Sequence, residues 1–136
     1  MSGYAKPLPR LDDANQPFWD GARRGAVMLQ RCRGCGAFRF PAARACVRCH
    51  GTDSDWLPTS GRGTVESFCV FHKGYFPGFA PPYNVVVVVL DEGVKLFSNL
   101  VGIDDAAIRI GMKVEALFEP ATDAVTLVKF KPVATT

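Results

Sequence analysis

The sequence predicts a mostly β protein built in two parts, and three observations support this prediction. Four of the five cysteines form two C-x-x-C pairs that are separated by ten residues. Five stretches rich in β-branched and aromatic residues follow the second pair, and a short helical stretch lies between the third and the fourth. These features predict a short N-terminal helix, then a rubredoxin-like zinc ribbon, and then a five-stranded OB-fold barrel.

The segment before the first cysteine pair predicts the short helix. Asn15 is a candidate N-cap, Pro17 lies in the first turn, and Gly25 is a candidate C′ residue. Such a helix carries Phe18 and Ala22 on one face. Because two helical turns are not stable alone, we expect the helix to pack on the ribbon, on the barrel or on another protein.

The two cysteine pairs predict one tetrahedral metal site with four thiolate ligands. Gly36 and Gly51 follow the pairs and permit the positive φ that a metal-binding turn requires. Four thiolates leave no open coordination position, so we expect the metal to stabilise the fold and not to catalyse a reaction. Zinc is the predicted metal, although iron bound as in rubredoxin uses the same ligands. The predicted ligands are Cys32, Cys35, Cys46 and Cys49.

The second pair also belongs to the segment 46–50, CVRCH, which matches the C-x-x-C-H signature for covalent haem attachment. The N-terminus lacks the apolar stretch of an export signal, and haem is normally attached to this motif after export. We therefore interpret the cysteines as metal ligands in a cytoplasmic protein. His50 is expected to be a solvent-exposed imidazole, and Cys69 a small buried residue on a strand.

The barrel is predicted to follow the segment Gly61-Arg62-Gly63. Residues 83–90 form a nearly continuous valine run, which is typical of a strand buried on both faces. The expected domains are residues 1–27 for the arm and helix, 28–60 for the ribbon and 61–136 for the barrel. The expected strands are 64–72, 83–90, 94–101, 113–119 and 124–131, with a helical turn at 104–108.

The connection between the first two barrel strands, residues 73–83, contains four aromatic residues and three prolines. In OB-folds this connection borders the ligand-binding face. Its aromatic side chains are suited to stack on a base, to line an acyl or adenine groove, or to contact a protein. A rigid loop that closes the barrel end is the structural alternative.

Several short segments occur in an order that is specific as a set. They are Pro17-Phe18-Trp19, the two cysteine pairs, Trp56 before Gly61-Arg62-Gly63-Thr64-Val65, Pro82-Tyr83 before the valine run, Leu90-Asp91-Glu92-Gly93, and Ile110-Gly111-Met112-Lys113-Val114. In this order the chain resembles the acyl-CoA-associated DUF35 family, which joins a zinc ribbon to an OB-fold.

The resemblance implies a non-catalytic accessory subunit in a hetero-oligomer. Its partner would be a thiolase-fold or MaoC-like enzyme, and the subunit would help form or bridge the partner's acyl-CoA site and share the coenzyme A thioester. The residues agree, because the sequence offers no nucleophile with a base and a third orienting group. The candidate contacts with the partner or the acyl-CoA are Phe18, Trp19, Arg39, His72, Tyr75, Phe76, Phe79 and Tyr83.

Two other functions follow from the same features. A zinc ribbon with an OB-fold also suits a module that binds single-stranded nucleic acid. The charge disfavours it: four thiolates and a zinc dication bring the formal charge from +3 to about +1, and residues 64–136 hold six basic against eight acidic residues. A rubredoxin-like electron carrier is the third possibility. The longest apolar run, residues 85–90, is too short to cross a membrane.

Overall fold

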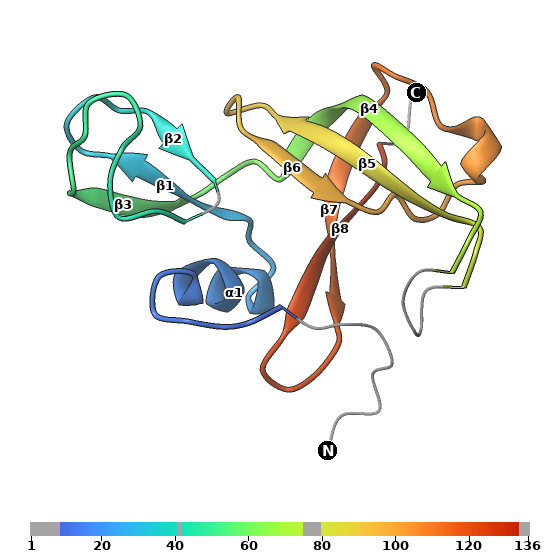
Figure 1. The fold of residues 1–136 in the computed structure, drawn as a ribbon, viewed down its shortest axis with the longest axis horizontal. Helices are drawn as coiled ribbons and strands as arrows, with labels where there is room; N and C mark the ends of the chain where they lie inside the picture. Colours follow the sequence, from blue (N-terminus) through green and yellow to red (C-terminus); the bar gives the residue numbers. More distant parts are fainter. Residues whose placement is uncertain (1–8, 41, 75–79, 134–136) are drawn as a thin grey trace.

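The computed structural model describes residues 9–40, 42–74 and 80–133, and these form two antiparallel sheets with one short α-helix beside them (Figure 1). The smaller sheet carries the N-terminal part of the chain, and the larger sheet is curled. The structure therefore confirms the predicted mostly β class with a short N-terminal helix. Among the described residues, no helix has the length and apolar character needed to span a bilayer.

The helix α1 (Gln16–Arg23) lies where the sequence predicts it and ends before Gly25, whose φ is 82°. Asn15 is the N-cap, but its side chain does not bond the helix. Instead, the Asp12 N–H donates to Asn15 Oδ1 over 2.9 Å, and the Asn15 N–H donates to Asp12 Oδ1 over 2.8 Å. This reciprocal pair fixes the turn that leads into the helix. The predicted N-cap position of Asn15 is therefore confirmed, but its side chain stabilises the preceding turn and does not bond the N–H groups of the helix.

The smaller sheet forms the ribbon, with β1 (Met28–Cys32) between β2 (Phe38–Arg39) and β3 (Ser54–Pro58). The first cysteine pair begins at the end of β1 and continues into the turn before β2. The second pair lies in the long connection from β2 to β3. Because β1 pairs with both neighbours, it brings these two connections to the same end of the sheet.

The larger sheet contains five strands in the order β6-β5-β4-β7-β8. Their bounds are β4 Arg62–Phe71, β5 Tyr83–Leu90, β6 Lys95–Ser98, β7 Lys113–Pro120 and β8 Thr126–Pro132. A parallel bridge between Leu100 and Phe130 joins the segment after β6 to β8, so the sheet curls back on itself. The 3-10 helix η1 (Asp105–Ala107) lies between the third and fourth strands. This order and this helical turn confirm the predicted OB-fold.

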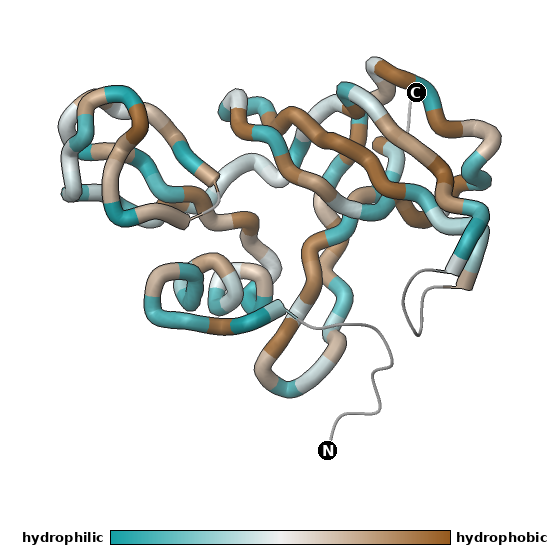
Figure 2. Tube along the Cα trace, viewed as in Figure 1, coloured by the Kyte–Doolittle hydropathy of each residue, from teal (hydrophilic) through white to brown (hydrophobic). Residues whose placement is uncertain are grey.

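The valine run of β5 alternates between two environments, although Figure 2 shows the strand as almost continuously hydrophobic. Val86, Val88 and Leu90 are buried, whereas Val85 and the valines at every second position after it are only half-buried. The prediction of a strand buried on both faces is therefore wrong. The curled sheet packs its core against the inner face, and among the described residues no second layer covers the outer face of this strand.

Cys69 corrects a second expectation for the same reason. It is exposed and not buried, and on β4 it pairs with Val85 of β5. Because directly paired residues point to the same side of a sheet, Cys69 shares the outer face with the half-buried valine. Its place in the β-branched stretch indicated a strand but did not indicate which face of the strand it occupies.

One hydrophobic core joins the two parts of the chain. Phe18, Val27 and Leu29 from the N-terminal part belong to the same cluster of buried side chains as Val65 and Phe130 of the barrel. The helix also contacts the extended hairpin of β7 and β8 (Figure 1). The ribbon and barrel are therefore held together by packing and not only by the connecting chain.

Candidate metal centre and its surroundings

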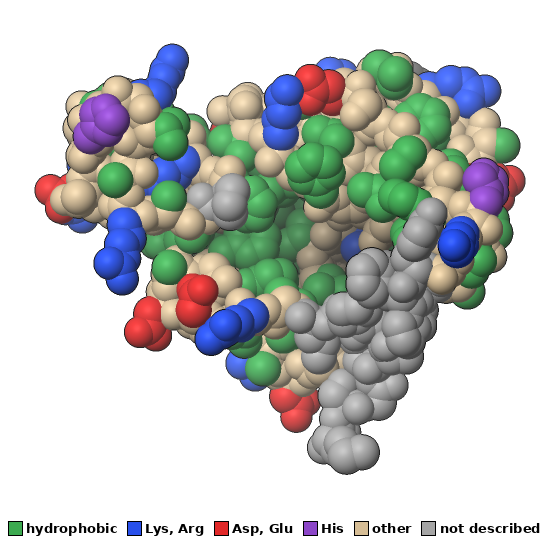
Figure 3. Space-filling model, in the orientation of Figure 1, with side chains coloured by type: hydrophobic (Ala, Val, Ile, Leu, Met, Phe, Trp, Pro, Cys, Tyr) green, Lys and Arg blue, Asp and Glu red, His purple; other side chains and the backbone are tan. Residues whose placement is uncertain are grey.

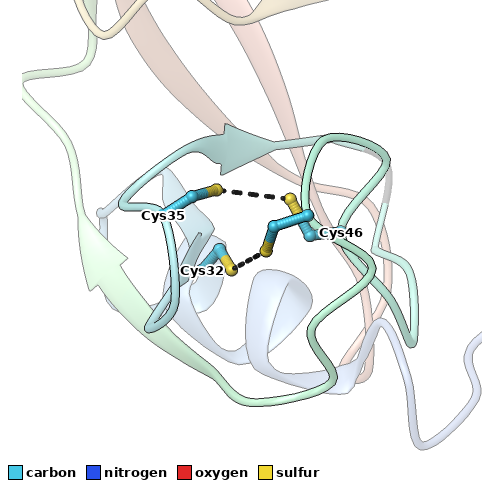
Figure 4. Close-up of side chains that lie close together, drawn as sticks. Cys32, Cys35 and Cys46 are labelled. Atoms are coloured by element: carbon cyan, nitrogen blue, oxygen red, sulfur yellow. Dashed lines mark hydrogen bonds between the residues drawn. The ribbon is translucent and has the colours of Figure 1, made fainter.

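The four predicted ligand atoms lie together at one end of the ribbon (Figure 4). All four Sγ atoms are within 4.8 Å of one another. Cys32 Sγ is 3.4 Å from Cys49 Sγ, and Cys35 Sγ is 3.5 Å from Cys46 Sγ. These distances exceed a disulfide bond of about 2 Å. They approach the separation of roughly 3.8 Å between thiolates around one tetrahedral zinc with Zn–S bonds of about 2.3 Å. The sulfur positions therefore fit a zinc ion.

The two metal-binding turns have the same backbone geometry. The Gly36 N–H donates to the Cys32 carbonyl over 2.9 Å, and the His50 N–H donates to the Cys46 carbonyl over 2.8 Å. Gly36 has a φ of 77°, as predicted, but in the second turn the residue with positive φ is His50, at 63°. The expectation that Gly51 supplies the positive φ is wrong, because this turn ends one residue earlier. The His50 side chain is exposed, as expected.

Glycines next to the sulfurs have a different role, which is to leave room. A Cβ added at Gly34 would lie 3.4 Å from Cys49 Sγ, and one added at Gly51 would lie 3.3 Å from the same sulfur. Both added atoms would also lie 3.7 Å from Cys32 Sγ. A Cβ at Gly51 would thus be closer to Cys49 Sγ than an ordinary contact, whereas one at Gly34 would lie at the limit of ordinary van der Waals contact.

Backbone N–H groups favour the thiolate form of two of the ligands. The N–H of Cys49, followed by that of Arg48, lowers the pKa of Cys46 to about 6. The N–H of Cys35 is the main cause of the lowered pKa of Cys32. For Cys49 the N–H of Gly51 also lowers the pKa, but hydrogen bonds with the other three thiols and burial outweigh it and raise the pKa to about 11. A bound dication would favour the thiolate form of all four ligands.

Arginines around the metal centre have partners within the ribbon. Arg33 Nη2 lies 2.7 Å from Asp55 Oδ1, and this hydrogen bond is the main cause of the lowered pKa of Asp55. The Arg31 guanidinium lies 5.3 Å from the centre of the Phe38 ring. These contacts give two of the basic residues a structural role, which weakens an interpretation of the ribbon as a nucleic-acid surface.

Arg39, a predicted partner contact, is half-buried and engaged inside the ribbon. Its Nε donates to Gln30 Oε1 over 3.2 Å, and its Nη2 donates to the Ala43 carbonyl over 2.9 Å. The buried Gln30 accepts the Ala43 N–H over 2.8 Å and donates back to the Ala43 carbonyl over 3.1 Å. Gln30 and Arg39 thus position the connection that leads to the second cysteine pair. Sequence reasoning did not single out Gln30, because this contact is not local.

The other predicted contact residues occupy separate places. Phe18 is buried in the core with its ring centre 5.0 Å from that of the half-buried Trp19. His72 is exposed beyond the end of β4, and Tyr83 stacks on Phe71 with 5.1 Å between ring centres. The structure does not bring these two groups together. The predicted contacts Tyr75, Phe76 and Phe79 lie outside the described residues.

Two segments that the sequence singled out separately contact each other where the ribbon meets the barrel. The Ser60 N–H donates to Glu92 Oε2 over 3.0 Å, and the Asp91 N–H donates to the Arg62 carbonyl over 3.0 Å. A Cβ added at Gly63 would lie 2.5 Å from the Val89 carbonyl oxygen. The turn after β5 therefore holds the connecting segment in place, and only glycine fits at position 63.

The fold and the site together define a class of protein, in which a four-cysteine zinc ribbon and an OB-fold share one core. A family model for the ChsH2 rubredoxin-like zinc ribbon domain matches residues 19–55, and a model for the ChsH2 C-terminal OB-fold domain matches residues 56–119. A DUF35 domain-containing scaffold protein of Methanocaldococcus jannaschii is 33% identical over 112 residues, which are 76% of this chain and 79% of that protein. The chain belongs to the DUF35 family.

Other relatives are described as parts of acyl-CoA enzymes. A probable enoyl-CoA hydratase alpha subunit of Thermomonospora curvata is 35% identical over 127 residues, 93% of this chain but 40% of that protein. The benzoylsuccinyl-CoA thiolase subunit BbsA of Thauera aromatica is 33% identical over 72 residues, which cover 53% of this chain and 49% of BbsA. The solved Ltp2-ChsH2(DUF35) aldolase contains a chain that is 35% identical, with a TM-score of 0.85 over 92% of this chain and 98% of that one.

Proposed function

We propose that this protein is a non-catalytic accessory subunit of an acyl-CoA-processing enzyme. It binds a thiolase-fold or MaoC-like partner and helps form or bridge the acyl-CoA site of that partner. The observation that carries this proposal is the match of nearly the whole folded unit to the DUF35 chain of an aldolase complex. Relatives described as a hydratase alpha subunit and a thiolase subunit support the same class of partner.

The chemistry of the described residues supports a non-catalytic role. The candidate metal site offers four thiolates, and four ligands close a tetrahedral zinc site against substrate. Zinc bound there would stabilise the ribbon through its thiolate ligands. Within the described ranges, neither His50 nor His72 forms a hydrogen bond with a serine, threonine or cysteine side chain of the kind that activates a nucleophile. The reacting groups would then come from the partner.

The coenzyme A thioester is proposed to be shared between the two subunits. Trp19, His72 and Tyr83 are at least partly accessible and remain candidates for contact with the thioester or the partner. Phe18 and Arg39 are more deeply engaged in packing and hydrogen bonds, so their effect on the partner would act through the shape of the ribbon.

Co-expression with a thiolase-fold or MaoC-like protein encoded near this gene tests the proposal. We expect a stable complex of defined stoichiometry in size-exclusion chromatography with light scattering, and acyl-CoA turnover that requires both chains. A zinc-loaded rubredoxin tested in place of this chain is the control for nonspecific stimulation. The proposal fails if no such enzyme forms a complex with the chain and none changes its activity when the chain is added.

A further inference from the structure

The four cysteines of the metal centre differ in their exposure to solvent. The first cysteine of each pair is buried, with Cys32 2% and Cys46 3% exposed, whereas the second cysteines, Cys35 and Cys49, are exposed. Figure 1 shows that β1, which ends at Cys32, runs away from the barrel, and Figure 3 shows that this end of the ribbon stands clear of the barrel. A small reagent in the solvent can therefore approach two of the four cysteines directly.

Two short sulfur contacts each join an exposed cysteine to a buried cysteine of the other pair. Cys49 Sγ lies 3.4 Å from Cys32 Sγ, and Cys35 Sγ lies 3.5 Å from Cys46 Sγ, as the dashed lines in Figure 4 mark. A disulfide bond is about 2.05 Å long, so each contact would have to shorten by only about 1.4 Å to form one. An accessible cysteine with a second cysteine beside it is the arrangement typical of thiols that oxidants convert to disulfides.

Two glycines flank the contact between Cys32 and Cys49. Gly34 and Gly51 both lie so close that an added Cβ would be within 3.4 Å of Cys49 Sγ and 3.7 Å from Cys32 Sγ. Because neither residue has a side chain, neither of them covers the two sulfur atoms. We therefore expect this contact to react first when a small oxidant reaches the ribbon.

We infer that the metal centre is also a site of reversible oxidation, at which a hydroperoxide joins Cys49 to Cys32 and Cys35 to Cys46. The Cys49 thiolate attacks one oxygen of hydrogen peroxide, the O–O bond breaks, and a sulfenic acid and a hydroxide form. The Cys32 thiolate then attacks the Cys49 sulfur, and a second hydroxide leaves as the disulfide forms. The two sulfurs lose two electrons in total, and these electrons reduce one peroxide. A second peroxide oxidises Cys35 and Cys46 in the same way.

Oxidation replaces one closure of the ribbon with another. The oxidised site no longer offers four thiolates, so it loses its affinity for zinc. Both disulfides nevertheless join the end of β1 and the turn after it to the connection between β2 and β3, which are the segments that carry the metal ligands. The oxidised ribbon therefore keeps its fold without metal, whereas the reduced ribbon does not. This property belongs to the chain alone and does not depend on the function proposed above.

Disulfide mapping of the zinc-loaded chain after treatment with hydrogen peroxide tests this inference. An arginine lies between the cysteines of each pair, and two more lie between the pairs, so trypsin separates all four cysteines. After alkylation of the remaining thiols, mass spectrometry should find the cross-pair linkages at least about tenfold above linkages within a pair. A colorimetric indicator should detect the release of the bound zinc. Cys69→Ser removes the exposed cysteine outside the cluster, and this control should give the same linkages.

Amide hydrogen exchange distinguishes a disulfide closure from oxidative damage. The peroxide-treated, zinc-free chain should keep its protection in β1 to β3, and a chain stripped by a chelator in the presence of dithiothreitol should lose it. Dithiothreitol followed by zinc should return the oxidised chain to its starting state. Disulfides within the pairs, sulfinic or sulfonic acids in place of the cross-pair linkages, retention of zinc, or loss of protection on oxidation would each overturn the inference.

Discussion

At the scale of single residues, the backbone limits which residue type fits at two positions: one has a left-handed conformation, and at the other a neighbouring strand lies too close for a side chain. His50 adopts a left-handed conformation that its counterpart Gly36 adopts without a Cβ in the other turn. Gly63 has no free space for any side chain. His50 follows the second cysteine pair, and Gly63 belongs to the segment that precedes the barrel. Only the three-dimensional structure shows the positive φ of the first and the lack of space at the second.

We predict that His50→Gly stabilises the metal-bound protein. The left-handed region costs a residue with a Cβ about 1–2 kcal/mol, and the greater freedom of glycine in the unfolded chain offsets part of this gain. A net increase of about 0.5–1 kcal/mol in the free energy of unfolding is expected in urea titrations with zinc present. The control His50→Ala keeps the strain and should leave stability nearly unchanged. An equal gain from both variants would contradict strain at this position.

Gly63→Ala is predicted to destabilise the barrel through overlap. The added Cβ would lie 2.5 Å from the Val89 carbonyl oxygen and 2.7 Å from Val88 Cγ1. Overpacking of this kind costs about 1–3 kcal/mol. Gly93→Ala is a comparison for backbone strain without overlap, because its φ is 91° but nothing lies within 4 Å of the added atom. Thermal unfolding should show a larger loss for Gly63→Ala, and a negligible loss for Gly63→Ala would contradict the overlap.

At the scale of elements, the ribbon and the barrel differ in what stabilises them. The ribbon has three short strands beside a metal site, whereas the barrel has five strands around a continuous core. The helix α1 belongs to both, since its buried face enters the common core. Removing the metal and removing a core side chain of the helix should therefore affect different parts of the molecule.

Loss of the metal is predicted to disorder the ribbon while the barrel strands persist. Cys46→Ser or a zinc chelator removes the ligand set on which the ribbon depends. Zinc content measured by mass spectrometry should fall from one ion per chain, and amide hydrogen exchange should rise in β1 to β3 only. Cys69→Ser is the matched control, because this exposed cysteine lies outside the cluster. Simultaneous loss of protection in β4 to β8 would show that the two parts unfold as one unit.

Phe18→Ala is predicted to destabilise the whole fold. Phe18 is 7% exposed, and its ring centre lies 5.2 Å from that of Phe40 in the ribbon. Truncation of a buried phenylalanine costs about 3–5 kcal/mol. Urea unfolding should show a loss near this range, while Trp19→Ala, which removes a half-buried ring, should cost less. A negligible effect of Phe18→Ala would argue that the helix packs loosely against the core.

At the scale of the whole molecule, the sequence predicted what depends on local spacing. The four clustered cysteines, the five strands and the helical turn between β6 and β7 all follow from short-range patterns. The exposure of alternate β5 valines and of Cys69 did not follow, because it depends on which face of the curled sheet is covered. The contact between Ser60 and Glu92 joins segments far apart in the chain and had no local signal. The domain bounds 1–27, 28–60 and 61–136 and the cytoplasmic location stay predictions.

The parallel bridge between Leu100 and Phe130 has a consequence for how the chain acquires its structure. The barrel closes only when β8 joins it, and α1 near the start of the chain also packs against β8 near its end. Most of the contacts that define the fold thus join residues of large sequence separation, which slows folding. During synthesis the helix and the open sheet therefore keep apolar surface exposed to water until β8 leaves the ribosome.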